Sequence, residues 1–187
     1  SIIFKVHDNT YSVNSKYINT ILQLPKYEKL PDVPPYITGI FPYRGDIIQM
    51  LDLRRLLGLP TLTEEFQQFE QMLEIRKQDH IHWVNELERT IQTGEKFTLA
   101  TDPHQCAFGK WYDSYSNDSN AIMFQLRKIE EPHRRLHEAA LEAARCKQEC
   151  EKCNRSECLK KVLDKAKEQY ASRILALLDE AKDVFKS

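Results

Sequence analysis

The sequence predicts an α+β protein in which a small β-subdomain, residues 1–60, precedes an antiparallel four-helix bundle, residues 61–187. The first observation is a change of composition near Pro60. Six of the eight prolines and three of the five glycines lie in the first 60 residues, whereas all five cysteines and five of the six histidines follow them. The second is a change of pattern, from short β-rich runs to long stretches with apolar residues at every third or fourth position.

Short β-rich runs account for most of the first 60 residues. Ile2–Val6 and Tyr11–Val13 flank a polar turn and predict a hairpin. A second pair of runs, 36–41 and 46–53, is joined by a turn that contains a glycine. Residues 17–24 fit either a short helix or an irregular link, and Gly58 and Pro60 then mark the end of this part.

Three long helices and a short one are expected after Pro60. The first begins at a capping box, residues 61–64, and ends at Gly94. The second is expected over Asn120–Arg145 and the third over Glu157–Phe185, with a short helix near Phe108–Tyr112. Because each long segment has one apolar face, burial of these faces against one another gives a bundle.

Composition argues against several classes of function. The 27 basic and 28 acidic residues give a net charge of −1, without the basic excess typical of nucleic-acid binding. The uncharged runs reach only about a dozen residues, short of the roughly 18 that a membrane span needs. With no visible signal peptide, a cytoplasmic protein is expected. The odd number of cysteines and their uneven spacing favour metal or redox chemistry over a secreted disulfide framework.

Three histidines occupy the apolar faces of the predicted helices. His80 lies in a core position of the first helix, while His133 and His137 are one turn apart on the same side of the second. Such a pair can bind one metal ion, and Cys106, between the helices, can supply a further ligand. Three imidazoles and a thiolate suit tetrahedral Zn²⁺. Any one of these histidines alone is more often a core residue, so the prediction depends on the whole set.

The three pieces HIHW (80–83), CAFGKW (106–111) and HRRLH (133–137) occur in an order that resembles the chemoreceptor zinc-binding (CZB) domain. The resemblance covers roughly residues 64–187 and implies a four-helix bundle. It also implies that the zinc ligands are His80, Cys106, His133 and His137. His82 and His104 match no ligand position and are expected at the surface or beside the ligands.

The CZB resemblance further implies a sensory role, because these domains are associated with detection of zinc or of oxidants such as hypochlorous acid. A zinc-bound thiolate stays deprotonated and nucleophilic, so oxidation of Cys106 would weaken one ligand. A purely structural zinc ion is the alternative. Pro132 is expected to bend the second helix and so to aim His133 at the metal, although a tolerated kink is also compatible.

Four further cysteines gather where the second and third long helices should be joined. Four thiolates in one hairpin could hold a second Zn²⁺ or an iron–sulfur cluster, and reversible disulfides or free thiols are the alternatives. The CZB resemblance does not cover this cluster, which consists of Cys146, Cys150, Cys153 and Cys158.

Residues 34–60, PPYITGIFPYRGDIIQMLDLRRLLGLP, resemble the CheW-like domain, which links chemoreceptors to the histidine kinase CheA. The resemblance ends near residue 60, whereas a whole CheW-like domain is longer and has two linked β-barrels. It implies half of such a double barrel, with the helical bundle in place of the other half. Pro42 is expected to break a strand. Arg44, in the Arg-Gly turn, is the candidate partner contact, and a solvated turn arginine is the alternative.

The two resemblances together imply a bacterial chemotaxis adaptor that binds zinc and contacts CheA or a chemoreceptor, as a homodimer. A zinc buffer or structural zinc protein with no such partner is the alternative. An enzyme is not expected, because HExxH and glycine-rich phosphate loops are missing and four protein ligands leave no open position on zinc.

Overall fold

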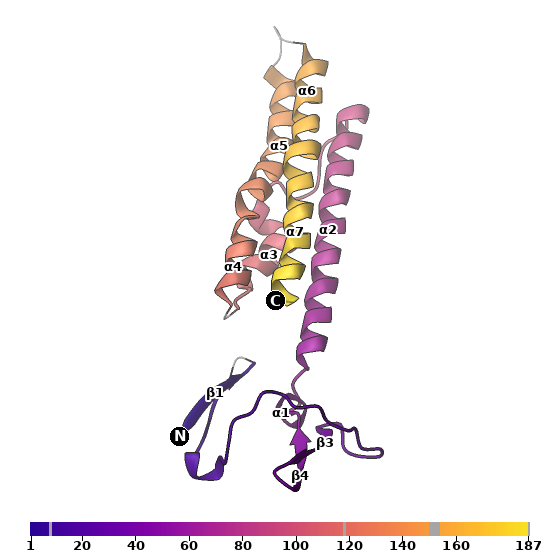
Figure 1. Cartoon of the computed structure of the whole chain (residues 1–187). Coiled ribbons are helices and arrows are strands. Elements are labelled where there is room, and N and C mark those ends of the chain that lie inside the picture. Colours follow the sequence, from indigo (N-terminus) through magenta and orange to yellow (C-terminus); the bar gives the residue numbers. More distant parts are fainter. Residues whose placement is uncertain (8, 118, 150–153, 187) are drawn as a thin grey trace. The chain divides into compact units, whose positions relative to one another are not determined.

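The computed structural model of the chain, shown in Figure 1, describes residues 1–7, 9–117, 119–149 and 154–186. It divides into two compact units, Ser1–Glu65 and Phe66–Ser187, which we describe separately. The first contains short antiparallel strands and the second contains helices, so the chain is α+β. Among the residues described, no helix combines the length and the apolar character that crossing a membrane requires.

The strands of the first unit form two separate hairpins. β1 (Ile2–Val6) pairs with β2 (Asn9–Val13), and β3 (Ile37–Tyr43) pairs with β4 (Asp46–Leu51). Residues 1–7 and 9–65 therefore contain no closed barrel. The short 3₁₀ helix η1 (Ser15–Tyr17) begins the connection between the hairpins, and residues 18–27 are an irregular link.

The turn of the second hairpin consists of Arg44 and Gly45. Both have positive φ, 52° and 95°, as a two-residue turn between strongly twisted strands requires. Arg44 is exposed, and its guanidinium lies 5.1 Å from the centre of the Tyr43 ring.

Pro42 does not break the strand as expected; it lies within β3, opposite Ile47. Ile40, two residues earlier, directs its N–H and C=O to Glu28 rather than to β4. Because backbone groups alternate along a strand, the nitrogen of Pro42 also faces away from β4. Its missing N–H removes no hydrogen bond from the hairpin, which explains why the strand continues.

Two capped helices follow the hairpins. Asp52 caps α1 (Leu53–Leu56) by accepting from the Arg54 N–H at 2.9 Å. The predicted capping box is confirmed at the start of α2 (Leu62–Thr93). There the Glu64 N–H donates to Thr61 Oγ1 at 3.2 Å and the Thr61 N–H donates to Glu64 Oε2 at 2.7 Å.

The helical unit packs the remainder of α2 against the helices that follow it (Figure 1). α6 and α7 are joined by η3, a π-helical segment (Lys165–Ala171), into one continuous rod beside α5. The core includes Leu73, Leu87, Leu126, Leu136, Ile174 and Leu177. The helices after α2 are α3 (Ala107–Ser114), α4 (Asn120–Arg127), α5 (Glu130–Glu149), α6 (Arg155–Asp164) and α7 (Ser172–Lys186).

The prediction of a single helix over Asn120–Arg145 is wrong, because the helix is interrupted between α4 and α5. The break lies at Lys128 and Ile129, where the Ile129 N–H donates to the Leu126 carbonyl at 3.0 Å in a tighter turn. Pro132 is the third residue of α5, and N–H groups in a first turn have no partner within the helix. Pro132 therefore lies at a helix start and does not kink a helix interior.

Candidate metal centre

The structure brings together the four residues that were predicted as metal ligands. One nitrogen or sulfur atom from each of His80, Cys106, His133 and His137 lies within 4.8 Å of all the others. His80 comes from α2, Cys106 directly precedes α3, and the other two come from α5. The three histidines are buried and Cys106 is partly buried.

The start of α3 positions Cys106. Cys106 is the N-cap residue of α3, and its sulfur accepts a hydrogen bond from the Gly109 N–H at 3.2 Å. The same sulfur lies 3.2 Å from the Pro103 carbonyl oxygen. Gly109 allows this approach, because a Cβ there would lie 1.9 Å from the same carbonyl oxygen. Burial raises the pKa of the Cys106 thiol, so the metal-free sulfur is protonated at neutral pH, whereas a bound cation would favour the thiolate.

Backbone carbonyls orient two of the imidazole rings. His80 Nδ1 lies 2.6 Å from the Arg76 carbonyl oxygen, and His137 Nδ1 lies 2.8 Å from that of Ala100. An Nδ1 that faces a carbonyl must be the protonated donor, so Nε2 of each ring has the free lone pair. Metal-bound histidines are held by this same kind of contact. Neither carbonyl could be identified from sequence motifs, because backbone oxygens are common to all residues.

Two of the distances between ligand atoms are close to the edges of a tetrahedral zinc site. His133 Nε2 lies 3.2 Å from Cys106 Sγ and 3.1 Å from His137 Nε2. Zinc–ligand bonds of ordinary length give tetrahedral edges of about 3.4 Å between nitrogens and about 3.6 Å between nitrogen and sulfur. His80 Nε2 is buried and has no hydrogen-bond partner among the described residues, which is costly unless a cation binds it. The residues therefore fit Zn²⁺.

Aromatic rings pack against the three histidine ligands. Phe108 is 2% exposed and lies edge-on to His133 and His80, at centroid distances of 5.0 and 5.7 Å. Trp83 lies 5.1 Å from His137 and donates from Nε1 to the Ala100 carbonyl at 2.8 Å. Burial lowers the pKa of His80 to about 4 and that of His133 to about 2, so both are neutral at pH 7, as metal ligands must be.

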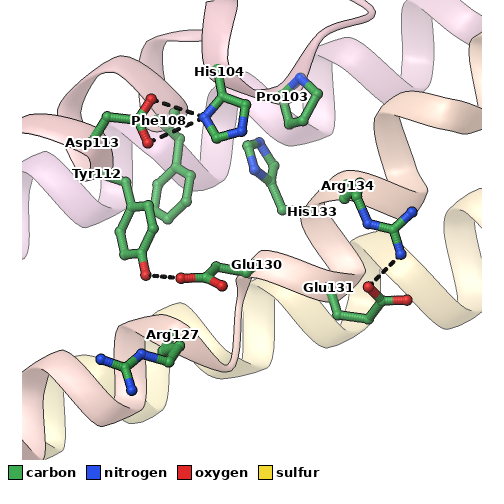
Figure 2. A pocket seen from close by; sticks show the side chains of 11 residues that line it. Pro103, His104, Phe108, Tyr112, Asp113, Arg127, Glu130, Glu131, His133 and Arg134 are labelled. Carbon is green, nitrogen blue, oxygen red and sulfur yellow. Dashed lines mark hydrogen bonds and ion pairs between the residues drawn. The ribbon is translucent and has the colours of Figure 1, made fainter.

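A cavity of about 450 Å³ opens beside His133. Figure 2 shows three polar pairs around it: Tyr112 with Glu130, His104 with Asp113, and Arg134 with Glu131. His104 is exposed, and its bond to Asp113 raises the pKa of its imidazole. His82, on α2, is also exposed, so neither of these two histidines is among the four clustered residues.

The four-cysteine cluster has a different outcome. Cys146 and Cys158 are joined by a disulfide, whereas Cys150 and Cys153 lie outside the described residues. In the disulfide form, the sulfurs of Cys146 and Cys158 are unavailable as thiolate ligands, so the hypothesised second metal site is not shown. A disulfide was one of the alternatives, but the spacing alone did not identify which cysteines pair.

Comparison with known protein families identifies both parts of the chain. The model of the CheW-like domain matches residues 1–96, more than half of the sequence. The chain belongs to the CheW-like family. The match extends beyond residue 60, where the resemblance of motifs was expected to end. The model of the chemoreceptor zinc-binding domain matches residues 80–144, a range that contains all four clustered residues.

One relative of this CheW-like protein is the chemotaxis protein CheW of Bacillus subtilis (strain 168). The two are 34% identical over 59 residues, which cover 32% of this chain and 38% of the relative. The chain thus spans well under half of the length of that relative. No solved structure matches the chain.

Replacing Gly109 with alanine should disrupt the metal centre. The added Cβ would collide with the Pro103 carbonyl and displace α3 together with Cys106. We expect zinc affinity, measured by competition with a chromophoric chelator, to fall by about tenfold or more. Lys110→Ala, at the exposed neighbouring position, is the control and should bind zinc normally. Unchanged affinity in Gly109→Ala would contradict this account of the site.

The metal-free protein should lose stability in acid. The pKa of His80 falls from 6.5 to about 4 on folding, so the unfolded chain takes up a proton at higher pH than the folded chain. The free energy of unfolding should therefore decrease as the pH falls from about 6.5 to about 4, by about 3 kcal/mol from His80 alone. Urea denaturation of chelator-treated protein measures this change. His80→Asn should make the decrease smaller by the contribution of His80, while His133, whose pKa is also lowered, continues to contribute. His82→Asn, at an exposed position, should leave the profile unchanged.

Proposed function

We propose that this chain is a chemotaxis adaptor that binds Zn²⁺ through His80, Cys106, His133 and His137 and reports the state of that site to CheA or a chemoreceptor. The observation that carries the proposal is the convergence of these four ligand atoms within 4.8 Å, in a chain that also has a CheW-like domain. The match to the chemoreceptor zinc-binding domain over residues 80–144 supports zinc as the ion.

Cys106 is the residue through which the site would sense zinc or an oxidant. When bound, zinc supplies the positive charge that holds the three imidazoles and the thiolate together. Cys106 is partly exposed and caps α3, so a change at its sulfur alters both the ligand set and the start of that helix. Oxidation to a sulfenic acid would weaken the ligand and loosen α3 from α2 and α5.

The finer architecture belongs to the same proposal. The helical unit acts as a four-helix bundle held by the metal, and the first unit acts as half of a CheW-like double barrel, with Arg44 as a contact for the partner protein. β4 is open to pairing and exposes apolar side chains on both faces, with Ile47 72% exposed on one face and Ile48 39% exposed on the other. These features support a homodimer or another protein partner rather than nucleic acid or membrane. We place the adaptor in the cytoplasm. We assign it no catalytic activity.

Metal content tests the ligand assignment directly. Protein purified without oxygen should contain about one zinc per chain by native mass spectrometry, and Cys106→Ser should lose most of it, because serine is a poor zinc ligand. His82→Ala, on the same helix as His80, is the control and should retain the metal. Zinc-free wild-type protein, or full zinc content in Cys106→Ser, would reject the assignment.

Partner binding tests the adaptor role. Immobilised CheA and a chemoreceptor cytoplasmic tail should each be incubated with the zinc-loaded protein, with chelator-treated protein and with Arg44→Ala. We expect at least one partner to be retained, less protein to bind after chelation, and Arg44→Ala to bind several-fold more weakly. Binding that is absent or insensitive to zinc would leave zinc buffering or a structural zinc ion as the better explanation.

A further inference from the structure

A disulfide joins the ends of α5 and α6 at a place that neither family match covers. Cys146 and Cys158 are twelve residues apart in sequence, and their Cα atoms are 6.0 Å apart. The CheW-like match ends at residue 96 and the CZB match at residue 144. The bond is thus a feature of this chain that the proposed metal centre does not explain.

The two sulfurs occupy different surroundings. Cys146 is 7% exposed and belongs to the buried core of the helical unit, whereas Cys158 is partly exposed. Cys158 is also in the first turn of α6, where its N–H donates to the Asn154 carbonyl at 3.0 Å. A helix N-terminus stabilises a thiolate, so Cys158 is the sulfur better suited to react first with a reagent from solution.

The disulfide lies at a junction of helices. Lys147, next to Cys146, donates from Nζ to the carbonyl oxygens of Thr90 and Glu95, at 2.8 and 3.3 Å. These contacts connect α5 to the C-terminal end of α2. On the other side, Cys158 connects α5 to α6, which continues through η3 into α7. Formation or loss of the bond therefore changes how firmly the end of α5 is held between its neighbours.

We propose that Cys146 and Cys158 form a reversible thiol–disulfide exchange site whose reactants are low-molecular-mass thiols and disulfides of the glutathione type. The inference rests on the proposed function in one respect, the compartment. A partner of chemotaxis proteins inside the cell meets reducing conditions, where protein disulfides are usually transient and redox-sensing. The site is separate from Cys106, which is the free cysteine among the described residues.

The exchange reaction balances without any further reagent. The Cys158 thiolate attacks one sulfur of the low-mass disulfide, forming a mixed disulfide and releasing one low-mass thiolate. Cys146 then loses its proton, and its sulfur attacks Cys158 Sγ, which releases the second thiolate. The two cysteines lose two electrons, the low-mass disulfide gains them, and the two protons end on the released thiols.

The first test measures exchange in the zinc-loaded full-length protein. It is equilibrated with mixtures of reduced and oxidised glutathione, quenched with an alkylating reagent and mapped by mass spectrometry. We expect Cys146 and Cys158 to change state together and reversibly, and the helical unit to unfold on the order of 5–10 °C higher in the oxidised form. A bond that excess reduced glutathione cannot open in the native protein, or one that never forms, would overturn the proposal.

Variants identify the order of the two steps. The double variant Cys150→Ser/Cys153→Ser is the control and should retain the exchange. In the Cys150→Ser/Cys153→Ser background, a further Cys146→Ser substitution should trap one glutathione on Cys158. A further Cys158→Ser substitution in the same background should trap much less glutathione on Cys146, because Cys146 is buried. Loss of exchange in the control, or equal trapping on both cysteines, would contradict the proposed site.

The same samples separate this proposal from the proposed function. Cys106→Ser should lose zinc but keep the Cys146–Cys158 exchange. Normal exchange in a protein that binds neither zinc nor CheA would overturn the adaptor role and leave the exchange site standing. Zinc and CheA binding in a protein whose Cys146–Cys158 pair does not exchange would overturn the exchange site alone.

Discussion

His80 Nε2 is buried among α2, α3 and α5, and nothing in the described part of the chain hydrogen-bonds to it, while three other ligand atoms lie within 4.8 Å of it. A buried nitrogen without a partner destabilises a fold unless something else compensates for its lost hydration. At neutral pH the imidazole does not become charged instead, because burial lowers its pKa to about 4. A cation shared with Cys106, His133 and His137 would satisfy this nitrogen and would connect α2, α5 and the start of α3.

The remaining contacts around the site position the ligands for that ion. The carbonyls of Arg76 and Ala100 select the tautomer of two imidazoles, and Trp83 binds the same Ala100 carbonyl. Gly109 brings α3 close enough to residues 103 and 104 for the Cys106 sulfur to reach His133. The site thus combines ligands distant in sequence, and a change at any one of them acts on the contacts between helices.

Two kinds of sulfur chemistry are separated within the helical unit. Cys106 lies among imidazoles, where a cation would control its protonation. Cys146 and Cys158 are paired with each other at the end of α5, among residues that pack into the core. A signal that acts on one of these sites need not act on the other, since the two sites share no residue and involve different bonding partners. α5 contains ligands of the first and one cysteine of the second, so both can influence the same helix.

The sequence by itself determined the order of the elements, the capping box at Thr61 and Glu64, and the four residues that cluster. These features depend on spacing along one chain segment or on a motif shared with known domains, both of which can be read from the residues. Only the tertiary structure decided that the helix is interrupted at Lys128 and that Pro42 remains in β3. It also decided that Cys146 pairs with Cys158 and that Ala100 orients His137. Each of these outcomes depends on which backbone groups lie opposite one another in space, and spacing along the chain does not contain that information.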